Sequence, residues 1–168
     1  MIFYPDKYFN NILGITYEFL YENKIKGIIL DVDNTLIDFE KNVLEGAVKW
    51  CEDLKQKGIK FYIVSNSNKK EKLENISKMF GAKYILFAKK PFIKAFKKVA
   101  KEMELEHRNI AAVGDQVFTD VMAANRSKMF SILVKPLNEK DIWLTVIKRP
   151  LENFILKKYF NKIEKEKK

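Results

Sequence analysis

The sequence predicts an α/β fold: a doubly wound, Rossmann-like parallel sheet of five strands with helices on both faces. Three observations support this prediction. Short apolar runs alternate along the chain with segments whose apolar residues recur at helical spacing. The run 28–30 is apolar at every position, which is typical of a central parallel strand buried on both faces. Polar and charged residues follow directly after several strands, at the edge where open α/β sheets bind ligands.

Length and composition predict one globular domain. With 168 residues and 47% apolar content, the chain can bury a full hydrophobic core. We divide it into an amino-terminal helical segment (1–26), a core that carries the candidate site (27–134) and a basic helical tail (135–168). The single cysteine, Cys51, cannot form an intrachain disulfide, and this favours a reducing compartment.

Neither a targeting segment nor a membrane-spanning helix is expected. Polar residues interrupt the first hydrophobic positions, so the start does not resemble a signal peptide. No run approaches the roughly 18 apolar residues that a spanning helix needs. We therefore expect a cytoplasmic protein, which could still associate peripherally with the inner face of a membrane.

The charge of the chain is strongly positive. The formal net charge is +10, from 32 basic and 22 acidic residues, and residues 140–168 hold nine Lys or Arg against four Asp or Glu. This balance favours polyanionic partners such as nucleic acid, anionic lipid or a phosphorylated substrate. The alternative is a generally lysine-rich composition that serves solubility.

The amino-terminal segment is predicted to form two short helical pieces. Gly14 interrupts the first, and Thr16 is placed to cap the second. Aromatic residues are dense in this segment, at Phe3, Tyr4, Tyr8, Phe9, Tyr17, Phe19 and Tyr21. We expect it to pack on the sheet or its helices; the alternative is an apolar face that dips into a membrane surface.

Strands and helices then alternate. The predicted strands are 28–30, 59–64, 84–87, 109–114 and 131–134. A capping-box pattern of Asn42 and Glu45 begins a helix that stops at Gly58, and the next helix ends at Gly81.

The second half of the chain continues the alternation. Pro91 lies at or near the first turn of a third helix, with Phe92, Phe96, Val99 and Met103 facing inward. A further helix runs from about 117 to 125. The tail from 137 onward is predicted to form one or two helices, and Pro150 starts the last of them.

Four strand ends present polar side chains to one edge of the predicted sheet. They are Asp31 with Asp33, Ser65, Lys90, and Asp115 with Asp120. Phosphoryl transfer needs a nucleophile, charge neutralisation and a proton donor for the leaving group. Asp31 is a candidate nucleophile, Asp33 a candidate acid and base, and Asp31 with Asp115 could bind Mg²⁺. Ser65 and Lys90 would then hold the non-bridging phosphate oxygens.

Each of these residues also has an ordinary structural interpretation. Ser65 could cap a turn or helix, and Asp115 could be a turn residue after a glycine. Lys90 alone would be a surface lysine, and Lys89 competes for its role. Asp120 could support the site or cap the helix that follows.

The motifs resemble those of the haloacid dehalogenase (HAD) superfamily. The run 31–36 (DVDNTL) is similar to its DxDxT signature, and Ser65, the Lys before Pro91, and 114–120 (GDQVFTD) are similar to its later motifs. The resemblance implies a HAD-type fold, with Asp31 as nucleophile and Asp33 as acid and base. It implies phosphate binding by Asn34, Thr35, Ser65, Asn66 and Lys90. It implies a Mg²⁺ site of Asp31, the Asp33 carbonyl and Asp115, with Asp120 in support.

The short intervals between the motifs leave no room for an inserted cap domain. An open site is expected, as in subclass III, and it suits large or surface-bound substrates. Residues 5–29, together with 88–91, 114–116 and 119–120, are similar to the YqeG-type phosphatases of subclass IIIA. That branch includes mitochondrial phosphatidylglycerophosphate phosphatases. This likeness implies a lipid phosphomonoester as substrate and an anionic membrane surface as partner.

Two other functions are compatible with parts of the sequence. A phosphatase acting on nucleic-acid ends or another soluble phosphomonoester would use the same chemistry and charge, although no array of aromatics interleaved with basic residues is present. A phospho-receiver or scaffold module would not be an enzyme. Receivers carry the phosphorylated Asp on a later strand, and here the third strand ends without an acid.

Overall fold

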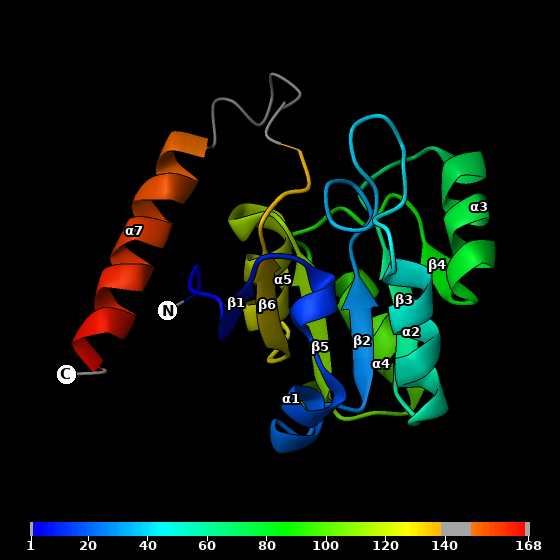
Figure 1. Cartoon of the computed structure of the whole chain (residues 1–168), viewed down its shortest axis with the longest axis horizontal. Helices are drawn as coiled ribbons and strands as arrows, with labels where there is room; N and C mark the ends of the chain where they lie inside the picture. The colour runs from blue at the N-terminus through cyan, green and yellow to red at the C-terminus, as the bar shows by residue number, and fades with distance from the viewer. Residues whose placement is uncertain (1, 139–148, 167–168) are drawn as a thin grey trace.

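A computed structural model describes residues 2–138 and 149–166. Within this part of the chain, six strands form one parallel sheet in the order β1-β6-β5-β2-β3-β4 (Figure 1). The strands are β1 Lys7–Phe9, β2 Gly27–Leu30, β3 Lys60–Val64, β4 Lys83–Ile85, β5 Ile110–Gly114 and β6 Phe130–Val134. β2, which precedes Asp31, lies in the middle of the sheet. The predicted doubly wound α/β fold is therefore confirmed.

The sixth strand, β1, corrects the prediction of five strands and of a helix at this position. Tyr8 pairs with Leu133 of β6 in parallel register, and the Asp6 and Lys135 amides add bonds at the two ends. The spacing of Tyr8, Phe9, Ile12 and Leu13 suits a helix, but pairing with a distant strand overrides so short a local pattern. Only Ile12–Gly14 forms a 3-10 turn (η1).

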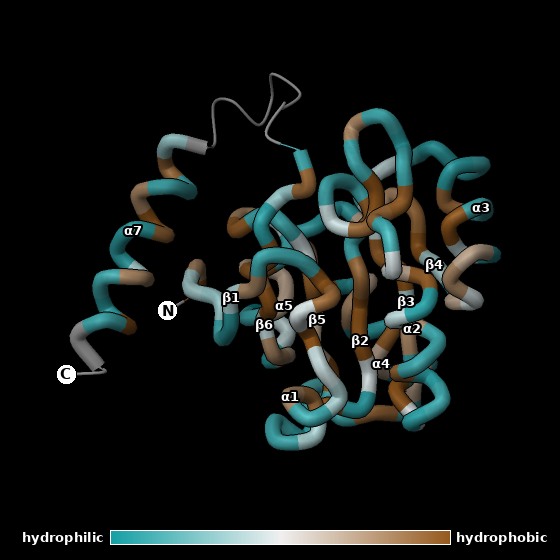
Figure 2. Tube along the Cα trace, in the orientation of Figure 1, coloured by the Kyte–Doolittle hydropathy of each residue, from teal (hydrophilic) through white to brown (hydrophobic). Residues whose placement is uncertain are grey.

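Alternate residues of the central strands point to two separate cores. On one face, Ile28 and Leu30 of β2 pack with α1 Tyr17–Glu22, α2 Ala47–Gln56 and α3 Lys70–Phe80. On the other face, Ile29 packs beneath α4 Lys94–Met103 and α5 Met122–Arg126. The central strands are accordingly mostly apolar, whereas the helices carry hydrophilic outer sides (Figure 2).

The helices end at the predicted glycines, but not every helix begins where the sequence predicts. Gly58, with φ 88°, follows α2, and Gly81, with φ 53°, caps α3. The capping box predicted at Asn42 is wrong, because α2 begins at Ala47. Asn42 instead donates to both carboxylate oxygens of Asp38, through its backbone and side-chain amides, and this fixes a turn in the long loop after β2.

The predicted inward position of Phe92 is also wrong. The helix α4 begins only at Lys94, so Phe92 lies in the preceding loop, where its side chain is 65% exposed. Phe96, Val99 and Met103 are buried as predicted. After the 3-10 turn η2 (His107–Asn109) and β5, the predicted helix 117–125 divides into a π-helical turn, η3 Val117–Val121, and α5.

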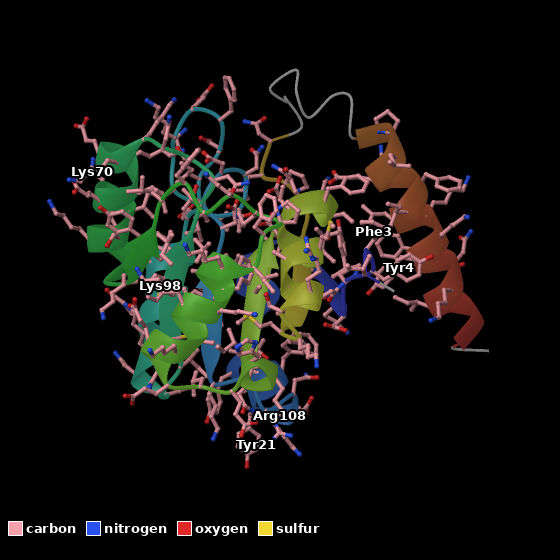
Figure 3. The ribbon with its side chains drawn as sticks, turned by 180° about the vertical axis from the view of Figure 1, so that it is seen from behind. Phe3, Tyr4, Tyr21, Lys70, Lys98 and Arg108 are labelled. Carbon is pink, nitrogen blue, oxygen red and sulfur yellow. The ribbon has the colours of Figure 1, made fainter. Side chains whose placement is uncertain are left out.

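The carboxyl-terminal helix α7 Arg149–Glu166 lies beside the β1 edge of the sheet (Figure 1). Edge-to-face ring contacts join it to the amino-terminal segment: Tyr4 with Tyr159 and Tyr8 with Phe160. Figure 3 shows Phe3 and Tyr4 directed toward this helix.

Only part of the apolar side of α7 is covered. Tyr159 is buried and Ile155 packs inward, but Leu151 and Phe154 are each 54% exposed. The part of the predicted tail helices that falls on 139–148 lies outside the described residues. No helix in the described ranges is long and apolar enough to cross a bilayer.

Candidate active site

The predicted site residues meet at the carboxyl edge of the sheet. Asp31 follows β2, Ser65 follows β3, Asp115 follows β5, and Lys90 lies in the loop after β4. Because parallel strands end at the same edge, residues separated by tens of positions become neighbours. These four side chains and Asp120 are all buried. Ionisable groups are rarely so buried without a partner or a function.

The Lys90 ammonium lies between two buried carboxylates. Its Nζ donates to Asp31 Oδ1 at 2.5 Å and to Asp120 Oδ1 at 2.6 Å. Lys89, the alternative candidate, extends elsewhere: its Nζ lies 5.0 Å from the centroid of the Phe87 ring. The positions of the two lysines thus favour Lys90 for the role at the site.

Asn66 holds the loop that carries Lys90. Its Oδ1 accepts from the Lys90 backbone amide at 2.6 Å, and its Nδ2 donates to the Lys90 carbonyl at 3.1 Å. Both polar atoms of this side chain are therefore engaged with protein backbone, whereas the sequence assigned Asn66 to phosphate binding. The nearby Ser65 Oγ accepts from the Ser67 amide at 3.1 Å, so this hydroxyl also stabilises a turn.

Two neighbours of Asp31 contribute polar atoms without protein partners. Asn34 Oδ1 and Thr35 Oγ1 are buried and make no hydrogen bond. Asn34 has a left-handed backbone, φ 59°, and its backbone bonds to Ile37 and Leu137 hold the loop in place. Buried polar atoms without partners are costly unless a ligand or water satisfies them. The Thr35 hydroxyl can donate to a phosphate oxygen, which fits its predicted role, whereas Asn34 Oδ1 can only accept a hydrogen bond.

Asp33 is separated from the buried cluster. Its side chain is 53% exposed, and its Oδ1 accepts from Lys72 Nζ of α3 at 2.6 Å. The Lys72 side chain is itself largely covered, at 17% exposure. Lys72 is not recognisable as a site residue in the sequence, because nothing distinguishes it from the neighbouring lysines at the start of α3.

Asp120 lies against the backbone of Gly114. A Cβ atom at Gly114 would lie 2.2 Å from Asp120 Cγ, which excludes any side chain there without a rearrangement. Asp120 Oδ2 also accepts from the Gln116 amide at 3.2 Å. Asp120 is therefore a bracing residue of the loop after β5 as well as a partner of Lys90.

Burial and mutual repulsion dominate the electrostatics. Burial raises the pKa of Asp31 to about 7, an effect that Asp120 reinforces and Lys90 opposes. Burial and the Asp31 and Asp120 charges raise the pKa of Asp115 well above its usual range. Burial alone would lower the pKa of Lys90, but Asp120 and Asp31 outweigh it, so the net shift is upward. Among the described residues of this buried cluster, the carboxyl groups of Asp31, Asp115 and Asp120 are thus accompanied by one ammonium group, that of Lys90. The cluster therefore has an excess of negative groups.

The residues fit a divalent cation. Oxygen atoms of Asp31, Asp115 and Asp120 lie within 4.8 Å of one another, and Asp115 Oδ1 is buried with no hydrogen-bond partner. Carboxylate oxygens are the ligands that Mg²⁺ prefers. This cluster includes the carboxylate of Asp120, whereas the Asp33 side chain lies outside it and is paired with Lys72.

Comparisons with known proteins agree with this geometry. The profile of the haloacid dehalogenase-like hydrolases matches residues 39–128. A Bacillus subtilis protein named "Probable phosphatase YqeG" is 39% identical over 155 residues, covering 92% of this chain and 90% of the relative. The chain therefore belongs to the haloacid dehalogenase-like hydrolases and is an enzyme of that family.

Solved structures support the fold. A structure of an uncharacterized Listeria monocytogenes protein has a TM-score of 0.57 at 18% identity, covering 70% of this chain and 85% of that one. The cobalt-bound deoxy-D-mannose-octulosonate 8-phosphate phosphatase of Haemophilus influenzae has a TM-score of 0.56 at 18% identity, with 83% and 91% covered. At this identity the likeness concerns the fold alone.

Proposed function

We propose that this protein is a Mg²⁺-dependent phosphatase that hydrolyses a phosphomonoester through an aspartyl-phosphate on Asp31. The observation that carries the proposal is the buried cluster in which Lys90 contacts Asp31 while Asp115 Oδ1 has no partner. Such a cluster places a nucleophile, a fixed positive charge and an unpartnered ligand atom close together. The relative named as a probable phosphatase supports the same reaction.

In the first step, Asp31 attacks phosphorus and the bond from phosphorus to the ester oxygen breaks. Asp33 donates its proton to the departing alcohol oxygen. Its exposed position, away from the buried cluster, suits contact with a leaving group that approaches from outside. The Lys90 ammonium, the unpartnered Thr35 hydroxyl and the side-chain N–H of Asn34 would donate to the phosphate oxygens.

In the second step, Asp33 accepts a proton from water, and the water oxygen attacks phosphorus. The bond from phosphorus to Asp31 breaks and inorganic phosphate leaves, which restores both carboxyl groups. Mg²⁺ held by the Asp31 and Asp115 carboxylates and the Asp33 carbonyl, with Asp120 close by, would neutralise charge where carboxylate and phosphate meet.

The substrate we propose is phosphatidylglycerophosphate, converted to phosphatidylglycerol at a membrane surface, in keeping with a subclass IIIA enzyme. The interval from Asp31 to Ser65 holds only a loop, α2 and β3, and the interval from Ser65 to Lys90 holds α3 and β4. Neither contains a cap domain. An open site can reach a phosphate group that remains attached to a bilayer.

A substrate panel tests this proposal. Mixed liposomes containing phosphatidylglycerophosphate are compared with sugar phosphates, nucleoside monophosphates and oligonucleotide 3′-phosphates, each with Mg²⁺. We expect the lipid to have the highest kcat/KM. Indifference to the lipid together with turnover of the oligonucleotide would replace the lipid with nucleic-acid ends, whereas inactivity toward every ester would refute the phosphatase itself.

A further inference from the structure

We propose that the loop between β4 and α4 (86–93), together with the outer face of α4, is the surface that docks this protein on an anionic bilayer. The choice of a bilayer rests on the proposed lipid substrate. The surface itself is defined by features independent of the catalytic cluster: two exposed aromatic rings, an apolar pocket and an uninterrupted basic segment.

The two rings are unusually exposed. Phe87 is 55% and Phe92 is 65% exposed, and they line one shallow pocket of about 480 Å³. The pocket wall includes Ile85, Ala88 and Ala95, so it is aliphatic as well as aromatic. An apolar surface of this kind on a protein's exterior commonly marks an interaction site.

Positive charge surrounds the pocket. The segment 86–101 contains six lysines and no Asp or Glu; five of these lysines are exposed, and Lys90 is buried at the site. Lys89, Lys94 and Lys98 line the pocket, and Figure 3 shows Lys98 on the outer side of α4. Exposed aromatic side chains surrounded by lysines suit binding to a bilayer surface. The aromatic side chains can enter the boundary of the acyl chains while the ammonium groups stay with the anionic headgroups.

The loop also connects this surface to the site. Lys90 lies between Phe87 and Phe92 in sequence, and its Nζ contacts Asp31. Asn66 fixes the Lys90 backbone from both sides. Insertion of the two rings would therefore bring the catalytic cluster to the level of the headgroups without a separate rearrangement.

The aromatic rings at Phe3, Tyr4 and Tyr8 are already occupied. In the amino-terminal segment, Phe3 contacts Phe118, and Tyr4 and Tyr8 contact rings of α7. These rings attach the tail to the core, so they are not free to enter a membrane. A nucleic acid would need successive rings along a basic groove for base stacking, whereas Phe87 and Phe92 converge on one pocket.

Vesicle binding by the full chain tests this surface. The probe is phosphatidylcholine vesicles with and without phosphatidylglycerol, compared for the wild type and a Phe87→Ala/Phe92→Ala variant. The matched control is Tyr21→Ala, an aromatic that is 72% exposed on α1 at the far end of the molecule (Figure 3). We expect wild type and control to bind the anionic vesicles alike, and the double variant to bind at least about tenfold more weakly.

A charge variant and a soluble substrate complete the design. Lys94→Glu/Lys98→Glu should weaken binding most at low salt. Hydrolysis of p-nitrophenyl phosphate by the phenylalanine variant should remain near the wild-type level, which shows that fold and site are intact. The proposal would be overturned if the Phe87→Ala/Phe92→Ala variant bound vesicles as tightly as the wild type. It would also be overturned if this variant lost binding to single-stranded DNA while its vesicle binding stayed unchanged.

The two proposals can fail separately. If no phosphomonoester is hydrolysed but vesicle binding depends on Phe87 and Phe92, the docking surface stands and the proposed function fails. If p-nitrophenyl phosphate is hydrolysed but the wild type ignores anionic vesicles, the phosphatase stands and the docking surface fails.

Discussion

Single residues at the site have separate tasks that depend on their burial. Lys90 is fully enclosed and bridges Asp31 and Asp120, whereas Asp33 is half-exposed and held by Lys72. If the Lys90 ammonium moved away, the buried carboxylates of Asp31 and Asp120 would be left without their positive partner, which is costly. The Asp33 side chain, which is 53% exposed, can instead exchange Lys72 for a group of the substrate. In the proposed mechanism, attack by Asp31 and proton transfer by Asp33 would therefore take place in different environments, although the two residues are only two positions apart.

Lys72 is expected to act as a positioning residue for Asp33. We predict that Lys72→Met lowers kcat about tenfold for alkyl phosphates, whose leaving oxygen needs a proton from Asp33. With p-nitrophenyl phosphate, whose leaving group needs no proton, the loss should be much smaller. The control is Lys70→Met, which removes only a surface pair with Glu74 at 3.5 Å. Equal losses on both substrates would show that Lys72 does not act through Asp33.

Gly114 is expected to tolerate no side chain. A Cβ would lie 2.2 Å from Asp120 Cγ, so Gly114→Ala should displace Asp120 from Lys90. We predict a loss of ~1–3 kcal/mol in the free energy of unfolding, measured by urea denaturation, together with reduced activity. Gly14→Ala meets only the Phe9 ring at 3.0 Å and should cost less. Equal stability of the two variants would contradict this account.

Secondary-structure elements were predictable where local pattern and burial agree. The central strands β2 and β5 are apolar throughout, and β3 is apolar after Lys60. Gly58 and Gly81 end their helices as expected. The edge strand β1 was not predictable, because its three residues are defined by pairing with β6, far along the chain. Contacts between distant segments decide such elements, and one sequence does not display them.

The site residues likewise divide into those that the local sequence predicts and those that depend on contacts between distant segments. The carboxylates, Ser65 and Lys90 could be predicted, because each comes after a recognisable strand or before a proline. The roles of Asn66 and Lys72 could not, because they arise when the loop after β3 and the helix α3 lie beside the loops that carry Lys90 and Asp33. Polar residues that position others carry no motif of their own.

Packing of α2 against α3 explains the behaviour expected of Cys51. Its side chain is fully buried, its Sγ lies 3.8 Å from the Phe80 carbonyl, and burial raises the pKa of the thiol to about 11. Because the thiolate is the reactive form, we predict no reaction with a disulfide reagent at pH 8 in the native state and full reaction in urea. Rapid modification of the folded protein would show that this helix interface opens readily.

At the scale of the whole molecule, the site is a concentration of like charge in a basic protein. The chain carries a net charge of +10, yet Asp31, Asp115 and Asp120 share only Lys90. A bound divalent cation would relieve their repulsion, and a ligand that binds only the folded state stabilises it by mass action. Cation binding should therefore be visible in global stability.

We predict that saturating Mg²⁺ raises the thermal midpoint by about 5 °C or more, measured by differential scanning fluorimetry. Asp115→Asn removes a charged ligand, so its midpoint should respond much less. Asp53→Asn, at an exposed carboxylate paired with Lys49, is the matched control and should respond as wild type does. An equal response from all three proteins would place the cation elsewhere.

The central claim is that Asp31 becomes phosphorylated during turnover. The most direct measurement is acid quenching of the enzyme during hydrolysis of p-nitrophenyl phosphate with Mg²⁺, followed by peptide mass spectrometry. The account predicts a phosphoryl group on the peptide that contains Asp31, and neither adduct nor activity in Asp31→Asn. A phosphoryl group on another residue, or turnover by Asp31→Asn at the wild-type rate, would contradict it.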